Sequence, residues 1–207
     1  MQKALKRMID ICLSTIGLII ACPAMLIIAL TIKLTSKGPV FFIQERAGKG
    51  GKAFRIYKFR TMYKGAESRT LGRYISREEA LLTPIGRNLR RYALDELPQL
   101  LNVLKGEMSM VGPRPTLSYQ VGNYDLHQRI RLDVKPGITG WAQVNGRNKL
   151  AWPDRIKLDT WYVENWSIGL DLRIILSTIP ALFRREYAFA QESADDDDIV
   201  RHDENEG

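Results

Sequence analysis

The longest apolar segment of the chain is an uncharged run of 22 residues from Ile11 to Ile32. As an α-helix, a run of this length can cross about 30 Å of hydrocarbon. The basic residues before it also fit a cleaved signal peptide, but the run exceeds the usual apolar core of such peptides and no A-x-A cleavage site accompanies it. The pattern therefore predicts a helix that stays embedded in a membrane.

Basic residues stand on both sides of this run. They are Lys3, Lys6 and Arg7 before it, and Lys33, Lys37, Arg46, Lys49 and Lys52 after it. Such residues favour the cytoplasmic side of a membrane, so a hairpin that enters and leaves by one face would keep both flanks there. Pro23, next to Cys22, removes a backbone hydrogen bond and bends the helix. Two topologies remain open on these residues: a re-entrant helix-break-helix and a kinked single span.

Beyond the apolar run, short β-rich segments give way to amphipathic helices. Two β-rich segments, Val40–Gln44 and Ala53–Phe59, are joined by a glycine-rich turn at residues 48–51, which predicts a β-hairpin. Two helices, "PDRIKLDTWYVENW" and "IGLDLRIILSTIPALF", are expected in the C-terminal third, which holds all four tryptophans. Their aromatic and basic residues suit a membrane interface, although an ordinary core explains the apolar stripe equally well. The expected fold class is α+β and mostly helical.

The middle of the chain contains two predicted helices with clear end signals. "TPIGRNLRRYAL" begins with Thr83 as an N-cap and Pro84 at the first helical position. "ELPQLLNVLKG" follows, with Asp95 expected as its cap and Gly106 as its stop. The segments "MSMVGPRPTLS" and "VKPGITGWAQVNGRN" are loops punctuated by proline and glycine. Each loop carries one arginine of interest, namely Arg114 and Arg147.

Charge is unevenly distributed along the chain. The net charge is +8, yet residues 192–207 hold eight acidic side chains and one arginine, which leaves +15 for residues 1–191. A strongly basic body suits an anionic partner, such as lipid head groups or nucleotide phosphates. One hypothesis is therefore a membrane-anchored protein that binds acidic lipid or nucleic acid without catalysis. No nucleic-acid-binding motif accompanies this charge.

The candidate chemistry centres on the adjacent carboxylates of Asp95 and Glu96. Helix capping alone would explain such a pair, but arginines at positions 87, 90, 91, 114 and 147 surround it in the sequence. Arginine binds phosphate through a bidentate fork. An ionised carboxylate beside bound phosphate can attack phosphorus and form an acyl phosphate. Two negative reactants need neutralising charge, so we expect Mg²⁺ held by phosphate oxygens and by Asp95 and Glu96.

Four long motifs in order carry a family resemblance. They are "KFRTM" (58–62), "LDELPQLLNVLKGEMSMVGPRP" (94–115), "KPGITGWAQVNGRN" (135–148) and "LDLRI" (170–174). Together they resemble the bacterial sugar transferases, the monotopic phosphoglycosyl transferases, over roughly residues 1–185. The resemblance is to the minimal catalytic form, so we expect a protein without the extra N-terminal membrane helices of larger members.

The resemblance implies roles for individual residues. Asp95 matches the nucleophile that takes a phosphosugar from a nucleotide diphosphate sugar, and Glu96 matches its partner in a catalytic dyad. Basic residues that match the family's phosphate-binding set are Lys58, Arg90, Arg114 and Arg147. Asp159 and Asp171 match family aspartates whose separate roles the sequence does not distinguish. The family breaks its re-entrant helix at Ser-Pro; this chain has Cys22-Pro23, and a thiol is a weaker hydrogen-bond donor than a hydroxyl.

The resemblance also implies partners and location. The donor would be a UDP-sugar and the acceptor polyprenyl (undecaprenyl) phosphate, with a covalent aspartyl-phosphosugar between them, in the first membrane step of glycoconjugate synthesis. Nucleic acid would not be a partner. We expect a re-entrant membrane helix (1–36), a catalytic domain (37–190) and a disordered acidic tail (191–207). The protein would lie on phospholipid at the cytoplasmic face of the bacterial inner membrane.

Overall fold

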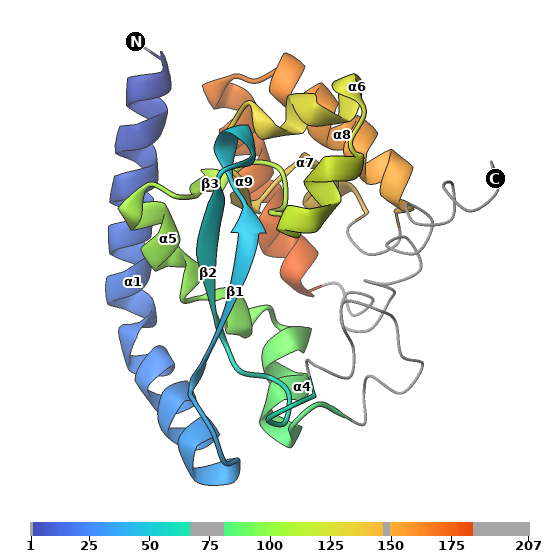
Figure 1. Ribbon diagram of the computed structural model, residues 1–207. Coiled ribbons are helices and arrows are strands. Elements are labelled where there is room, and N and C mark those ends of the chain that lie inside the picture. The colour runs from blue at the N-terminus through green and yellow to red at the C-terminus, as the bar shows by residue number, and fades with distance from the viewer. Residues whose placement is uncertain (1, 67–80, 147–149, 184–207) are drawn as a thin grey trace, which may run out of the picture.

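A long N-terminal helix lies along one side of the molecule in the computed structural model, which describes residues 2–66, 81–146 and 150–183 (Figure 1). This helix, α1, extends over Gln2–Thr35 and includes Pro23. The predicted interruption at Cys22-Pro23 is wrong, because the helix continues through the proline. Figure 1 instead shows α1 bending in the half that ends at Thr35. A bend is the expected effect of one missing backbone hydrogen bond in an otherwise intact helix.

The predicted β-hairpin is confirmed. Strands β1 (Phe41–Ala47) and β2 (Ala53–Phe59) pair antiparallel, with Phe41 opposite Phe59. A 3₁₀ turn, η1 (Lys49–Gly51), connects them, and it contains glycines with φ of 65° and 74°. Positive φ is the conformation that glycine adopts without steric penalty, which explains the glycine-rich turn. β1 extends three residues beyond the predicted strand end at Gln44 because its pairing with β2 continues to the turn.

Two short helices and a turn carry the central motif. Helix α4 (Pro84–Arg91) begins as predicted, since the Thr83 side chain accepts a hydrogen bond from the Gly86 amide at 3.0 Å. The 3₁₀ turn η2 (Leu94–Glu96) and helix α5 (Gln99–Lys105) follow. The prediction of Asp95 as the cap of this helix is wrong, because Asp95 lies inside η2 and Pro98 precedes α5. Gly106 ends α5 with a φ of 87°, as predicted.

The two predicted arginine-bearing loops meet in a small parallel sheet. Strand β3 (Ser109–Val111) pairs with β4 (Gly137–Thr139). The backbones approach closely beside this sheet, since a Cβ added to Gly137 would lie 2.1 Å from the Gly112 nitrogen. Only glycine fits there, so the glycine beside a proline in each loop has a packing cause. The sheet brings together segments that are 28 residues apart in sequence.

The remaining elements form a helical layer beside β3 and β4 (Figure 1). They are η3 (Ser118–Asn123), α6 (Leu126–Arg129), η4 (Ile130–Leu132), α7 (Trp141–Asn145), α8 (Trp152–Glu164) and α9 (Ile168–Phe183). α9 has the bounds of the predicted segment "IGLDLRIILSTIPALF". Val111 of β3, Tyr162 of α8 and Ile174 of α9 form a buried cluster that joins the layer to the sheet. The fold is α+β and mostly helical, as predicted.

Both ends of α1 contact the rest of the protein. Near its start, the Arg7 guanidinium donates to the carbonyls of Val103 and Leu104 at 2.6 and 2.8 Å. Near its end, Ile28 and Ile32 are buried in a cluster with Phe59 and Leu89. Between these contacts lies an exposed apolar face that includes residues 16, 19, 20, 26, 27 and 30. By length and composition, α1 can cross a membrane. The predicted tail at 191–207 lies outside the described residues.

Candidate active site

The acidic pair is turned inward by the backbone between α4 and α5. Ala93 has a φ of 53°, a left-handed conformation that reverses the chain at the end of α4. Asp95 and Glu96 both lie in the single turn of η2, and both residues are buried. A buried pair of adjacent carboxylates is costly unless cations compensate it. The surroundings of the pair supply that compensation.

Glu96 is held by two cations from different parts of the fold. The Lys58 ammonium of β2 and the Arg114 guanidinium, which follows β3, donate to the same Glu96 Oε1 atom at 3.0 and 3.1 Å. Charge-assisted hydrogen bonds of this kind are the stronger ones in proteins. Lys58 and Arg114, predicted to lie near the phosphates, therefore meet at the acidic pair.

Asp95 lies in the field of the same cations but keeps a high proton affinity. Burial, followed by repulsion from Glu96, raises the pKa of Asp95 from 3.8 to about 6, although Lys58, Arg90 and Arg114 lower it. From the sequence, a carboxylate at a helix start is expected to ionise readily. The raised pKa of Asp95 differs from that expectation, and burial explains the difference. Arg90 of α4 is held by its Nε, which donates to the Thr61 hydroxyl at 3.0 Å. Arg147 lies outside the described residues.

We predict that Asp95→Asn stabilises the protein above neutral pH. The native pKa of about 6 lies above the reference value of 3.8, so the folded protein binds a proton at Asp95 more tightly than the unfolded chain does. The stability that this proton contributes is fully present below pH 3.8 and is lost as pH rises through 6. A neutral asparagine escapes this loss, which amounts to roughly 1–3 kcal/mol. Thermal unfolding in detergent should show a gain at pH 8 that shrinks at pH 5. An equal effect at both pH values would contradict the raised pKa.

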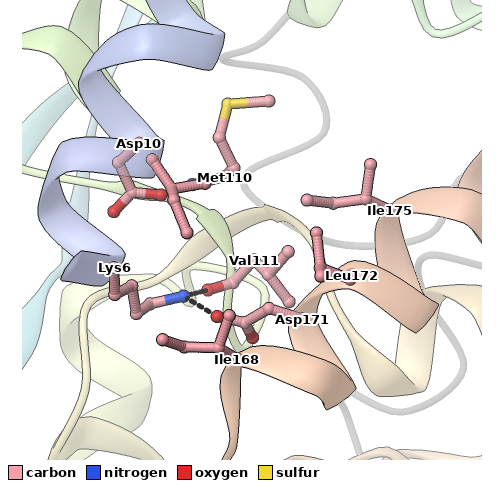
Figure 2. Close-up of a pocket in the computed structure, with 9 residues that line it drawn as sticks. Lys6, Asp10, Met110, Val111, Ile168, Asp171, Leu172 and Ile175 are labelled. Atoms are coloured by element: carbon pink, nitrogen blue, oxygen red, sulfur yellow. Dashed lines mark hydrogen bonds and ion pairs between the residues drawn. The ribbon is translucent and has the colours of Figure 1, made fainter. Parts of the chain in front are cut away.

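The two other predicted aspartates have partners of their own. Asp171 accepts hydrogen bonds from Lys6 at 2.6 Å, from the Tyr162 hydroxyl at 2.7 Å and from the Trp166 indole at 3.1 Å. Figure 2 shows Lys6 reaching from α1 toward Asp171 and the Val111 carbonyl, at one side of a small pocket between α1, β3 and α9. Asp159 pairs with the buried Arg131 at 2.6 Å. Both aspartates thus join elements of the scaffold.

Sequence reasoning missed two residues that hold the scaffold together, Asp10 and Arg131. Asp10 accepts hydrogen bonds from the Ser109 hydroxyl and the Met110 amide at 3.0 and 2.9 Å, so it anchors α1 beside Lys6. The spacing of Lys6 and Asp10 is a weak signal, since residues four apart share one helix face. Arg131 lies in the three-residue turn η4, whose sequence has no distinguishing pattern.

A divalent cation would find few protein ligands at this site. Within the described ranges, no group of three or more histidine, cysteine, aspartate or glutamate side chains could hold a metal. Mg²⁺ commonly uses one or two carboxylates and completes its shell with water and substrate phosphate. Asp95 and Glu96 fit that limited role, and they do not form an all-protein metal cage.

Fold and site together define a protein with an exposed apolar helix and a buried pair of carboxylates that a lysine and an arginine contact. The bacterial sugar transferase family model matches residues 1–185. EpsL of Bacillus subtilis, described as an uncharacterized sugar transferase, is 48% identical over 84% of this chain and 85% of its own length. The chain therefore belongs to the bacterial sugar transferase family, and it is a transferase.

Two longer relatives have more specific descriptions. The undecaprenyl-phosphate galactose phosphotransferase of Salmonella typhimurium is 39% identical over 91% of this chain. The UDP-glucose:undecaprenyl-phosphate glucose-1-phosphate transferase of Escherichia coli is 40% identical over 86% of it. This chain spans only 42% and 40% of the lengths of these two proteins. The two descriptions name different sugars, so overall similarity does not identify the sugar.

Proposed function

We propose that this protein transfers a sugar 1-phosphate from a UDP-sugar to polyprenyl phosphate through a covalent intermediate on Asp95. The single observation that carries the proposal is the buried Asp95–Glu96 pair faced by Lys58 and Arg114. The descriptions of relatives that act on undecaprenyl phosphate support the acceptor. One of these descriptions also includes a UDP-sugar, which supports the donor.

The first step forms a bond between Asp95 and phosphorus. A carboxylate oxygen of Asp95 attacks the phosphorus atom that bears the sugar, and the bond from that phosphorus to the bridging oxygen breaks. UMP leaves with the bonding electron pair. Arg114 and Lys58 stabilise the negative charge that builds up on the phosphoryl oxygens, and Arg90 contributes positive charge from α4. Glu96 holds Arg114 and Lys58 in position before the donor binds.

The second step regenerates Asp95. An oxygen of polyprenyl phosphate attacks the same phosphorus, the bond to the Asp95 oxygen breaks, and the carboxylate recovers its electron pair. The product is a polyprenyl diphosphate-linked sugar. When bound, Mg²⁺ would supply positive charge to the phosphates, with Asp95 and Glu96 as its protein ligands. No proton from Asp95 is needed in either step, provided that the carboxylate starts ionised.

The proposed location is the cytoplasmic face of the membrane, with α1 entering one leaflet and leaving by the same face. The support is that both ends of α1 dock on the same domain, through Arg7 near the start and Ile32 near the end. A straight crossing would place one of these ends, together with the part of the domain that holds it, on the far side of the bilayer. The exposed apolar face between them provides the surface that contacts lipid.

Single-cysteine labelling tests this topology. In a background with Cys12 and Cys22 replaced by serine, we expect Gln2→Cys and Lys49→Cys to react with an impermeant maleimide from the same side of membrane vesicles. The matched comparison uses vesicles of both orientations, so each site serves as its own control. Reaction of the two sites from opposite sides would overturn the re-entrant topology.

Release of UMP tests the proposed function. The purified full chain, polyprenyl phosphate and Mg²⁺ would be incubated with a small panel of UDP-sugars. We expect UMP and a lipid-linked phosphosugar from at least one donor. Absence of both UMP and the lipid-linked product with every donor in the panel would contradict the proposed function.

We predict that formation of the covalent intermediate increases with pH through about 6. Only the ionised Asp95 attacks phosphorus, and burial raises the pKa of this group to about 6. The rate at pH 5 should be roughly tenfold below the plateau, because each pH unit below the pKa reduces the ionised fraction by that factor. Single-turnover measurements at donor concentrations well below saturation report this dependence, because they reflect the pKa of the protein before the donor binds. A rate that is flat between pH 5 and pH 8 would contradict it.

A further inference from the structure

Arg131 of η4 is a buried cation away from the acidic pair. Only 3% of its side chain is exposed. A guanidinium stays charged when buried, so burial is costly unless carboxylate and hydrogen-bond acceptors replace the water around it. Asp159 provides the carboxylate, at 2.6 Å from Arg131 Nη2. The charge of Asp159 keeps the pKa of Arg131 above its usual value, in spite of burial.

The other hydrogen bonds of Arg131 lead toward Arg114. Its Nη2 donates to the main-chain carbonyl of Arg114 at 3.1 Å, and its Nη1 donates to the Tyr124 hydroxyl at 2.7 Å. The guanidinium also lies 5.6 Å from the Tyr124 ring centre and 5.3 Å from that of Trp152. Ion pair, hydrogen bonds and aromatic rings therefore fix the guanidinium in one place.

Arg114 lies in the loop at residues 112–117, between β3 and η3, which is called the Arg114 loop below. Tyr124 extends the network to the other end of this loop. Its hydroxyl donates to Thr116 Oγ1 at 3.0 Å, and the Thr116 hydroxyl donates to the Gln120 amide oxygen. That oxygen also accepts a hydrogen bond from the Leu117 amide at 3.1 Å. Arg131 thus supports the loop at Arg114 directly and at Thr116 through one tyrosine. Hydrogen bonds in such a chain strengthen one another.

The Arg114 loop also contacts the acidic pair. The Arg114 side chain donates to Glu96, whereas its carbonyl accepts from Arg131. Pro113 and Pro115 flank Arg114 and restrict its backbone. A shift of the carbonyl therefore moves the side chain as well. Displacements of about 1 Å at a catalytic group can lower rates by about 10²-fold.

We propose that Arg131 is a positioning residue that holds the Arg114 loop in its phosphate-binding geometry, and that Asp159 and Tyr124 serve this role through Arg131. This inference rests on the proposed function, because it assigns Arg114 to the phosphates of the donor. It gives Asp159 a role at a distance from the chemistry. Pairs of this kind are weak evidence for stability, and a defined loop geometry is a better-supported use of them.

A double-mutant cycle between Tyr124 and Arg114 tests the inference. Tyr124→Phe removes one hydroxyl and keeps the ring, so it disturbs the network mildly. We expect it to slow UMP release about 3–10-fold when Arg114 is present and less than about 2-fold when Arg114 is alanine. Arg131→Lys, which keeps the charge but loses the fork, should show the same dependence on Arg114. Equal losses in both backgrounds would overturn the positioning role.

Tyr57→Phe is the matched control. Tyr57 also accepts a hydrogen bond from a cation, Lys105 at 2.7 Å, and that cation lies 4.5 Å from its ring centre. This pair is not among the contacts of Arg131 described above, so Tyr57→Phe should leave UMP release within a factor of about 2. A loss in this variant equal to that of Tyr124→Phe would show a nonspecific effect and overturn the inference.

Hydrogen exchange separates failure of this inference from failure of the proposed function. The amides of Arg114, Thr116 and Leu117 should exchange faster in Tyr124→Phe and Arg131→Lys than in the wild type or in Tyr57→Phe. This readout needs neither donor nor turnover. Faster exchange without any UMP release in the wild type would leave the loop support intact and remove the proposed function. Unchanged exchange at these amides in both variants would overturn the support itself.

Discussion

Asp95→Asn should lower UMP release at least about 10³-fold, because an amide does not form the acyl phosphate on which the reaction depends. Asparagine has nearly the same shape as aspartate, so the cations around it should remain in place. The measurement is the initial rate of UMP release with the best UDP-sugar of the panel. The expected gain in thermal stability at pH 8 means that this loss is not due to unfolding. Sites that carry an unfavourable buried charge often exchange stability for function in this way.

Asp154→Asn is the control for this experiment. Asp154 is an exposed aspartate on α8, and it pairs with Lys157 at 3.1 Å on the surface. The variant should keep UMP release within a factor of about 2, since exposed ion pairs contribute little. Asp95→Asn activity within tenfold of the wild type would contradict the nucleophile assignment.

Glu96→Gln is the second large expected effect, and it should change both the rate and its pH dependence. The variant loses the charge that holds Lys58 and Arg114, so we expect UMP release to decrease about 10²-fold. Repulsion from Glu96 also contributes to the raised pKa of Asp95. Without that charge, the midpoint of the pH dependence of single-turnover rates should move below the value of about 6.

Lys58→Met provides the opposite comparison. Lys58 lowers the pKa of Asp95, so its loss should move the midpoint of the rate above about 6. Both variants lower the maximal rate, but only an electrostatic link to Asp95 shifts their midpoints in opposite directions. Shifts in the same direction, or none, would contradict the arrangement of charges at the site.

Elements with strong local signals were predictable from sequence. Thr83 and Pro84 begin α4, and Gly106 ends α5, because caps depend on a few neighbouring residues. Strand β2 and helix α9 have the predicted bounds for a similar reason, since each pattern is continuous over its length. The motif resemblance pointed to Lys58, Arg114 and the acidic pair, which the fold then brings together.

Long-range contacts were not predictable in this way. Asp171 meets Lys6 across 165 positions of sequence, and no local pattern indicates such a pair. The role of Asp95 as a helix cap was wrong because Ala93 reverses the backbone and creates a separate turn before α5. The helix break at Pro23 was wrong because the remaining hydrogen bonds of α1 continue past the proline. Burial, which raises the pKa of Asp95, likewise depends on the whole fold.

Trapping of the covalent intermediate tests the central claim most directly. The full chain would be incubated with a labelled UDP-sugar and Mg²⁺ in the absence of polyprenyl phosphate, quenched in acid and digested. We predict a phosphosugar on the peptide that contains Asp95, one equivalent of UMP, and loss of the adduct after polyprenyl phosphate is added. UMP formation that requires the acceptor, with no adduct on Asp95, would contradict the covalent mechanism.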